Sequence, residues 1–246
     1  MRNRDRWVSS KFDYSRGKLI ASRDRKQVGI GSRLMVDRIA GCYDAYIKQY
    51  ARGRLIDLGC GHVPLFAAYR DYITDNVCVD WAKTAHRSEY LDFECDLTEN
   101  LPVKDEEFDT IILSDVLEHI PQPERLWKEM SRILANHGRI LMNVPFYYWI
   151  HEVPHDYYRY TEFALRRFVD SSGLKLLVLK PLGGAPEILA DILAKNLLRF
   201  RGGKALAILI QQLTGALGST SPGRRLSEAT SERFPFGYFV VAEKSG

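Results

Sequence analysis

The stretch Arg54-Leu55-Ile56-Asp57-Leu58-Gly59-Cys60-Gly61 (residues 54–61) decides the fold class. A short apolar run that leads directly into glycines is typical of a buried strand followed by a tight turn. Further strands are predicted at 76–80, 90–96, 108–115 and 138–144, and helical patterns separate several of them. Strands that alternate with helices form right-handed crossovers and a mostly parallel sheet. The sequence therefore predicts an α/β fold.

The rest of the chain completes this pattern. Helices are predicted at 30–51, 64–73, 121–138 and 161–173, and two more strands at 174–182 and 236–244. We therefore expect one domain, residues 1–246, in which a seven-stranded sheet is the middle of three layers. Its expected parts are an N-terminal arm and helix (1–50), a core (51–182), a helical insertion (183–235) and the last strand (236–246).

The composition is that of an ordinary globular protein, with 46% hydrophobic and 27% charged residues. The four cysteines contain no C-x-x-C pair, which favours reduced thiols in a cytoplasmic protein over a disulfide framework or a zinc cage. The basic N-terminus leads into no apolar run, so we expect no secretory signal. No apolar stretch reaches the roughly 20 residues that a membrane span needs.

Charge is distributed in blocks. Residues 1–38 hold eleven Lys and Arg against four Asp and Glu, residues 195–233 hold seven against two, and residues 39–194 hold sixteen against twenty-four. Solvated basic arms are the simplest explanation. The alternative is an anionic partner, namely a phosphorylated substrate, a membrane surface or nucleic acid.

Polar residues follow the predicted strands where each one ends. Ligands of open α/β sheets bind at the carboxyl ends of the strands. The first strand ends in the glycine turn, and the next two end in Asp80 and in Asp96-Leu97. An acid such as Asp80 can accept hydrogen bonds from a ribose diol. The fourth strand ends in Ser114-Asp115, with Glu118-His119 one turn later.

This series resembles the class I S-adenosylmethionine-dependent methyltransferases of the type 11 kind. The resemblance rests on 56–61, Asp80, Asp96-Leu97 and 108–120, in this order and spacing. It implies a Rossmann-like three-layer sandwich and S-adenosyl-L-methionine as cofactor. The cofactor would be held by eight residues: Asp57, Gly59, Cys60, Gly61, Asp80, Asp96, Leu97 and Ser114. Many relatives have a third glycine where this chain has Val63, which affects the shape of the turn.

Two alternatives were weighed for these residues. A dinucleotide site of the G-x-G-x-x-G type needs glycine at position 64, where the chain has Pro64. An acid at position 57 would also repel a pyrophosphate, whereas it suits a cationic sulfonium ligand. Helix capping explains one acid at a strand end easily. It explains three acids at consecutive strand ends less well.

Residues 143–161 form a second concentration of chemistry. His151-Glu152-Val153-Pro154-His155 matches the zinc protease pattern H-E-x-x-H. That motif needs a helix, which Pro154 disfavours, so we reject it. We expect instead an acceptor-site loop, because it resembles an H-D-Y-Y-R-Y-T segment of bacterial methyltransferases linked to sugar and polysaccharide pathways.

The acceptor-site hypothesis assigns roles within this loop. Substrate-binding residues would be His151, Asp156, Tyr157, Tyr158 and Arg159. A structural polar network is an equally good explanation of Asp156 and Arg159. An oxygen or nitrogen acceptor must lose a proton, and histidine is the usual base. We place His155 first and His119 second as catalytic base, and no metal cluster is apparent in the sequence.

The insertion and the N-terminal arm complete the predictions. Apolar residues in 186–198 and 204–217 follow helical spacing beside basic residues. We favour a lid or a dimer face, and peripheral contact of 186–217 with an anionic membrane is the alternative. Residues 218–223 are predicted as a mobile loop. The N-terminal arm is expected to fold over the cleft.

The expected function is methyl transfer to an oxygen or nitrogen of a small polar, sugar-like acceptor. The alternative is a non-catalytic protein that keeps the fold and binds a membrane or a partner. A nucleic-acid methyltransferase is not expected, because no N/D-P-P-Y motif follows the fourth strand.

Overall fold

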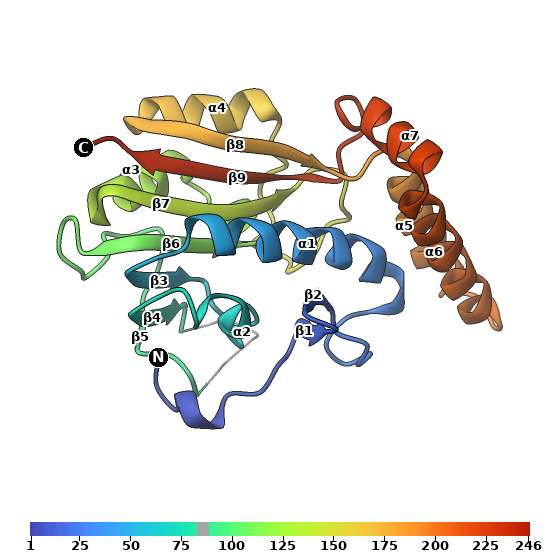
Figure 1. The fold of residues 1–246 in the computed structure, drawn as a ribbon, viewed down its shortest axis with the longest axis horizontal. Helices are drawn as coiled ribbons and strands as arrows, with labels where there is room; N and C mark the ends of the chain where they lie inside the picture. The colour runs from blue at the N-terminus through green and yellow to red at the C-terminus, as the bar shows by residue number, and fades with distance from the viewer. Residues whose placement is uncertain (83–88) are drawn as a thin grey trace.

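The computed structural model describes residues 1–82 and 89–246. Seven strands form one sheet in the order β5-β4-β3-β6-β7-β9-β8 (Figure 1). The strands are β3 (Arg54–Leu58), β4 (Asp75–Asp80), β5 (Phe93–Glu94), β6 (Phe108–Ser114), β7 (Leu134–Pro145), β8 (Leu174–Leu182) and β9 (Gly237–Lys244). Strands β3 to β7 pair in parallel, and β9 runs antiparallel to β7 and β8. The predicted α/β fold with a mostly parallel sheet is confirmed.

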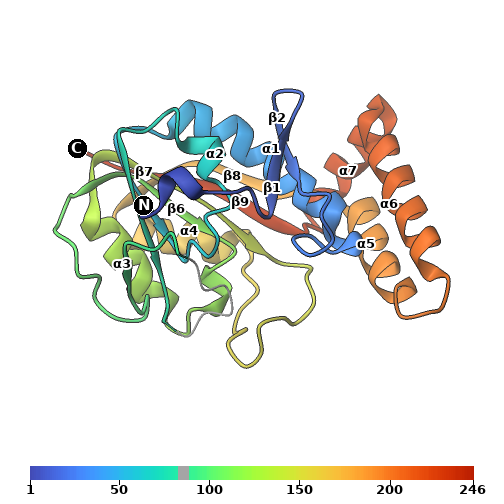
Figure 2. The same ribbon diagram turned by 90° about the horizontal axis from the view of Figure 1, so that it is seen from below.

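Helices cover both faces of the sheet. Helices α1 (Arg33–Tyr50) and α2 (Phe66–Tyr69) lie on one face, and α3 (Pro123–Ile133) and α4 (Glu162–Ser171) lie on the other (Figures 1 and 2). Neighbouring residues of a strand point to opposite faces. Leu55 of β3 accordingly belongs to the core under α1, whereas Ile56 belongs to the core under α3 and α4.

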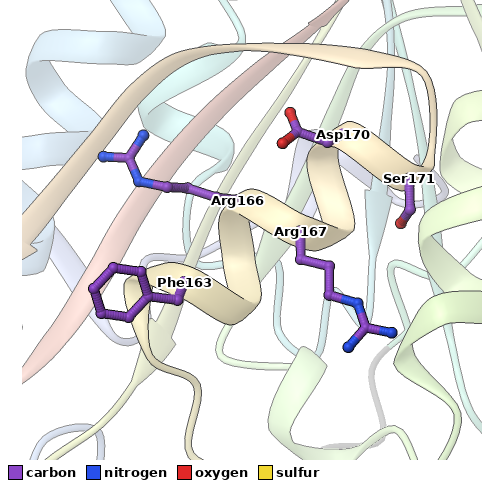
Figure 3. Close-up of a pocket in the computed structure, with 5 residues that line it drawn as sticks. All are labelled: Phe163, Arg166, Arg167, Asp170 and Ser171. Carbon is purple, nitrogen blue, oxygen red and sulfur yellow. The ribbon is translucent and has the colours of Figure 1, made fainter.

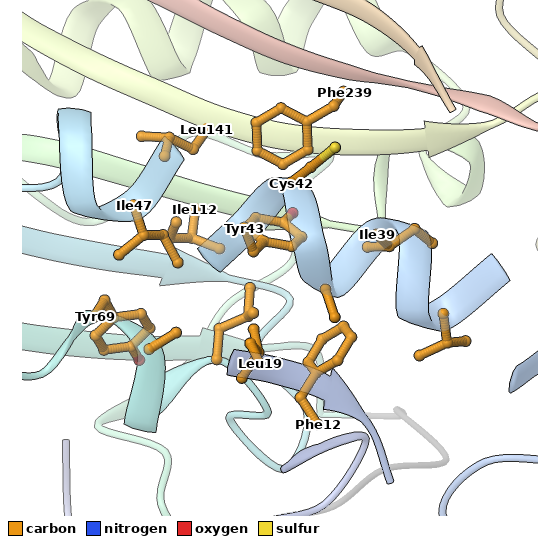
Figure 4. Close-up of a cluster of buried hydrophobic side chains, with 14 of the residues drawn as sticks. Phe12, Leu19, Ile39, Cys42, Tyr43, Ile47, Tyr69, Ile112, Leu141 and Phe239 are labelled. Atoms are coloured by element: carbon orange, nitrogen blue, oxygen red, sulfur yellow. The ribbon is translucent and has the colours of Figure 1, made fainter. Parts of the chain in front are cut away.

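The core under α1 is connected to the polar end of the sheet through Tyr43. Its ring packs edge-on against Phe239 of β9, with centroids 4.9 Å apart (Figure 4). Its hydroxyl donates a hydrogen bond of 2.8 Å to Oδ1 of Asn143 on β7. Tyr43 therefore fixes Asn143, which stands near the end of β7, from within the core.

The N-terminal arm contains a hairpin that the sequence did not predict. Strands β1 (Phe12–Ser15) and β2 (Lys18–Ala21) pair antiparallel. Phe12 and Leu19 are buried in the core under α1. Upstream of the hairpin, the indole of Trp7 donates to the carbonyl of Val63 over 3.1 Å. The arm is therefore attached to the glycine-turn region as well as to α1.

The insertion forms a helical unit at one end of the sheet (Figure 2). It consists of α5 (Ala185–Leu197), α6 (Gly203–Ser219) and α7 (Ser221–Ser231). The mobile loop predicted at 218–223 is wrong, because α7 starts there. Thr220 caps α7 by accepting a hydrogen bond from the Gly223 amide over 3.1 Å, and Pro222 occupies the first turn, where proline is tolerated.

Two predicted helices are shorter than expected. The helix predicted at 121–138 ends at Ile133, and β7 begins at Leu134, which pairs with Phe108 of β6. Pairing with a central strand outweighs the helical pattern of this segment. The helix predicted at 64–73 contracts to the four residues of α2.

Among the described residues, no helix combines the length and the apolar character that crossing a membrane requires.

Candidate active site

A cavity of about 770 Å³ opens at the carboxyl ends of β3, β4 and β6. Its size lies within the range typical of small-molecule sites. Seven of the eight residues predicted to hold the cofactor line it: Gly59, Cys60, Gly61, Asp80, Asp96, Leu97 and Ser114. The N-terminal arm contributes Ser10, Lys11, Lys26 and Gln27, as expected for an arm that folds over the cleft.

The glycine turn after β3 requires glycine at position 59. Gly59 has a φ of +69°, and a Cβ there would lie 2.5 Å from Cγ2 of Val116. The amides of Gly59 and Cys60 both donate to the carbonyl of Val79, over 2.8 and 3.1 Å. The turn is therefore held against the end of β4. Val63 adopts a φ of +50°, a left-handed conformation that glycine favours, at the position where many relatives have glycine.

Asp80 joins the glycine turn to β4. Its carboxylate accepts hydrogen bonds from the amides of Gly61, over 2.8 Å, and Trp81, over 2.7 Å. Asp96 accepts from the amide and the hydroxyl of Thr98, over 2.9 and 2.7 Å. Both carboxylates are therefore oriented by short local contacts at the rim of the cavity.

Asp57 lies elsewhere. It is 3% exposed and is not among the described residues that line the cavity. Its Oδ2 accepts a hydrogen bond of 3.2 Å from the hydroxyl of Tyr69. Burial, reinforced by the charge of Asp80, raises the pKa of Asp57 to about 7. Its side chain points into the core under α1, so it supports the turn from behind.

The end of β6 carries a polar network that the sequence did not predict. Lys11 from the arm forms an ion pair of 2.5 Å with Oδ2 of Asp115. Oδ1 of Asp115 accepts from the amide of Asn143 over 2.6 Å, and Ser114 donates to Oδ1 of Asn143 over 3.0 Å. Burial lowers the pKa of the Lys11 ammonium, but the Asp115 carboxylate outweighs it and raises that pKa overall.

The loop after β7 contains no helix between His151 and His155, which confirms the premise for rejecting the protease motif. His155 and Tyr157 line the cavity, whereas His151, Asp156, Tyr158 and Arg159 are not among the described lining residues. Asp156 and Arg159 form a bidentate pair with distances of 2.6 and 2.8 Å. This pair also holds the backbone amide of His151, so it organises the loop.

Of the two predicted bases, both line the cavity. Nδ1 of His155 lies 3.2 Å from the hydroxyl of Tyr157, and its ring meets Trp81 edge-on at 5.2 Å. His119 turns Nδ1 toward the carbonyl of His155, 2.9 Å away. The two histidines are thus neighbours, although they follow different strands.

Glu118 is a residue whose role the sequence did not reveal. It is fully buried beside His119, and neither carboxylate oxygen has a hydrogen-bond partner among the described residues. His119 and His151 both place Nε2 3.8 Å from Oε1 of Glu118. The acidic residue before His119 was visible in the sequence, but its burial and its approach to His151 depend on the tertiary fold.

A second hollow lies on the outer surface of α4, far from the strand ends (Figure 3). Its lining residues all belong to this one helix: Phe163, Arg166, Arg167, Asp170 and Ser171. Figure 3 shows these side chains pointing outward in different directions. They do not converge on a common point, so this hollow is not the candidate site.

Residues 56–142 match the model of a family described as a methyltransferase domain. This range contains β3 to β6, most of β7 and the whole glycine turn. The fold is that of a methyltransferase domain. An uncharacterized protein of Methanocaldococcus jannaschii is 27% identical over 101 residues, which are 41% of this chain and 49% of that protein. The methyltransferase-like chain therefore matches about half the length of this curated relative.

Solved structures share this methyltransferase fold. The cyclase SpnF has a TM-score of 0.56 at 18% identity, covering 85% of this chain and 83% of its own. A phosphoethanolamine N-methyltransferase of Haemonchus contortus, in complex with phosphomonomethylethanolamine and S-adenosylhomocysteine, has a TM-score of 0.52 at 14% identity. That likeness covers 91% of this chain and 59% of the other. Because one of these proteins is a cyclase, the shared fold alone does not define the reaction.

Proposed function

We propose that this protein is a class I S-adenosylmethionine-dependent methyltransferase that acts on an oxygen or nitrogen of a small polar acceptor. The main support is that one cavity brings together a left-handed glycine turn and the carboxylates of Asp80 and Asp96 at successive strand ends. The family match falls on the same strands. A sugar-like acceptor and a cytoplasmic location belong to the same proposal.

The residues of the cavity suit the cofactor. The turn at Gly59 has no room for a side chain, so a ligand can approach its backbone closely. Asp80 would accept hydrogen bonds from the ribose hydroxyls, and Asp96 with Leu97 would hold the adenine. The ammonium of Lys11 at the opposite wall is suited to a carboxylate. Asp57 would support the turn instead of touching the ligand.

The cofactor, when bound, supplies a methyl group on a sulfonium that is already a good leaving group. The protein then has to align the acceptor and take its proton. Alignment alone contributes up to about 7–11 kcal/mol in the best intramolecular reactions. His155 stands in the cavity beside Tyr157 and is our first choice of base; His119 is the second. Tyr157 is the predicted substrate-binding residue best placed to contact an acceptor.

Isothermal titration with S-adenosylmethionine tests the proposal. We expect binding by the parent chain and a loss of roughly 10-fold or more in affinity for Asp80→Asn, because a charged hydrogen-bond acceptor is removed. Asp170→Asn, on the surface of α4, should bind like the parent. Absence of binding by a chain that is folded by circular dichroism would overturn the proposal.

We also propose that the helical unit contacts an anionic membrane surface. Its leucines are exposed, among them Leu193, Leu206, Leu209 and Leu213, and Phe200 at the α5–α6 turn is 68% exposed. Residues 192–227 contain six Lys and Arg and no Asp or Glu. An apolar face with basic neighbours favours a lipid surface over a neutral protein surface. None of the described cavity-lining residues comes from 183–235, which argues against the lid.

A further inference from the structure

Three potential metal ligands meet next to the cavity. Glu118, His119 and His151 each offer one ligand atom, and these atoms lie within 4.8 Å of one another. Nε2 of each histidine is 3.8 Å from Oε1 of Glu118. Ligands about 2.1 Å from a shared tetrahedral ion would lie roughly 3.4 Å apart. The three side chains are therefore close to the spacing that such an ion imposes.

The carboxylate of Glu118 has no hydrogen-bond partner to justify its burial. It is 0% exposed, and both oxygens lack a hydrogen-bond partner in the described part of the chain. Nε2 of His119 is likewise buried and unpartnered there. Burying a carboxylate without hydrogen bonds is costly, and buried charges are normally paired or coordinate metals. A third group is therefore expected between these atoms.

The surroundings of the two histidines fix which nitrogen faces Glu118. Nδ1 of His119 faces the carbonyl of His155, which can only accept, so Nδ1 carries the proton. Nδ1 of His151 lies 3.3 Å from both Oδ2 of Asp156 and the carbonyl of Trp149, which are also acceptors. In the neutral rings both Nε2 atoms therefore present lone pairs toward a carboxylate. Lone pairs and a carboxylate that converge in this way call for a cation.

The same contacts are those that orient metal-binding histidines. A histidine ligand usually donates its other N–H to a carboxylate or a backbone carbonyl. His151 has such a carboxylate in Asp156, which Arg159 holds by its bidentate pair. His119 has the carbonyl of His155. The supporting contacts are thus complete for both rings.

We propose that Glu118, His119 and His151 bind a divalent transition-metal cation of the zinc class. Two imidazoles and one carboxylate favour zinc or cobalt over magnesium or calcium, which prefer oxygen ligands. Three protein ligands leave a coordination position open, as in catalytic zinc sites. His119 and Glu152 line the cavity, so that position lies on the cavity side. As a metal ligand, His119 is no longer a candidate base, and His155 remains.

The further role of the cation rests on the proposed methyltransferase function. An acceptor oxygen in the cavity would reach the open position and be polarised there. Metal binding itself is independent of the reaction, so it is measured directly and without the cofactor. A chain that binds the metal but no S-adenosylmethionine would contradict the proposed function and leave the metal site intact.

The test uses the full chain after dialysis against EDTA. It is titrated with Co²⁺, followed by visible absorption, and then with Zn²⁺ as competitor. We expect saturable uptake of one ion, with the spectrum of four- or five-coordinate cobalt, and displacement by Zn²⁺. Glu118→Gln and His151→Ala should each weaken binding by more than the roughly 10–100-fold typical of an outer supporting residue. His137→Ala, an exposed histidine on β7, should bind as the parent does.

Failure of the parent chain to take up Co²⁺ would overturn the proposal, and would mean that protons alone satisfy Glu118. Uptake that is equally strong in Glu118→Gln and His151→Ala would also overturn it. Because removal of a buried group can unfold a chain, circular dichroism is recorded for each variant. The titration of the parent chain does not depend on any variant, so it decides the question even when a variant fails to fold.

Discussion

Gly59 and Gly173 share the same backbone angle in different surroundings. Both have a φ of +69°, but a Cβ at Gly173 would meet no atom within 4 Å, whereas one at Gly59 would lie 2.5 Å from Val116. Gly173→Ala should cost about 1 kcal/mol from backbone strain alone. Gly59→Ala should cost roughly 2–4 kcal/mol and weaken cofactor binding, because the clash adds to the strain. Urea unfolding and isothermal titration measure the two effects.

The steric explanation has its own control. Val116→Ala removes the atoms that a new Cβ would meet. Combined with Gly59→Ala, it should restore part of the lost stability, because only the strain remains. Equal costs for Gly59→Ala and Gly173→Ala would show that crowding against Val116 does not matter.

Asp57 should make stability depend on pH. Burial raises its pKa from 3.8 to about 7, so the folded chain retains a proton that the unfolded chain has already released. Stability is then fully present below about pH 4 and is lost as pH rises to 7. Asp57→Asn removes this effect. The free energy of unfolding of the parent should therefore fall relative to the variant by up to about 4 kcal/mol between pH 4 and pH 8.

The comparison is made by urea unfolding of both chains at several pH values. Asp170→Asn, on the exposed surface of α4, serves as the control and should show a constant difference from the parent. A constant difference for Asp57→Asn as well would mean that the Asp57 carboxyl has an ordinary pKa in the folded chain.

Residue types at strand ends were predictable, but their orientation was not. The acids at 80 and 96 were placed at the cavity from spacing alone, because parallel strands bring their ends to one edge. Asp57 was assigned to the ligand, yet the alternation along β3 turns it into the core beside Tyr69. Glu118 and His151 are joined only by the path of the loop after β7, which no local pattern encodes.

At the scale of elements, Glu187 of α5 attaches the helical unit to the domain. Its buried carboxylate accepts from Arg38 of α1 over 2.9 Å, from the Gly184 amide over 3.0 Å and from Ser227 of α7 over 2.9 Å. Glu187→Ala leaves a buried amide and a guanidinium without their acceptor. We expect a loss of roughly 2–4 kcal/mol in stability and faster proteolysis within 183–235, measured by urea unfolding and limited digestion.

Glu228→Ala is the matched control for this prediction, because Glu228 lies on the exposed surface of α7. It should change stability by no more than about 0.5 kcal/mol. Cleavage of Glu187→Ala at the parental rate would show that the attachment depends on apolar packing instead.

Elements with strong periodicity were predicted well, whereas boundaries set by pairing were not. The helix starting at Glu162 was predicted within one residue, since Thr161 caps it. Residues 134–137 read as a helix end, but β6 recruits them into β7. The β1–β2 hairpin was missed because its strands have only four residues each, and it depends on burial of Phe12 and Leu19 under α1.

At the scale of the whole molecule, the proposed membrane contact predicts flotation with vesicles. We expect the chain to float with phosphatidylserine-containing vesicles at low salt and to be released at high salt, because surface attraction is screened. Phe200→Ser should weaken binding by roughly 10-fold or more. Phe163→Ser, which alters a 74% exposed phenylalanine on α4, should not weaken it.

Sedimentation equilibrium completes this test. A chain that stays with neutral and anionic vesicles alike in the unbound fraction, and that sediments as a dimer, would assign the exposed leucines to a second copy. In that case Phe200→Ser and its neighbours should shift the dimer toward monomer.

The position of β9 determines when the sheet can be completed during synthesis. Strand β8 pairs only with β9 among the described residues, and 183–235 is translated between them. A nascent chain therefore exposes one edge of β7 and both edges of β8 until β9 leaves the ribosome. The helical unit is made during exactly this interval of translation and attaches to α1 through Glu187, so it can hold β8 near its final place while the closing strand is still being made.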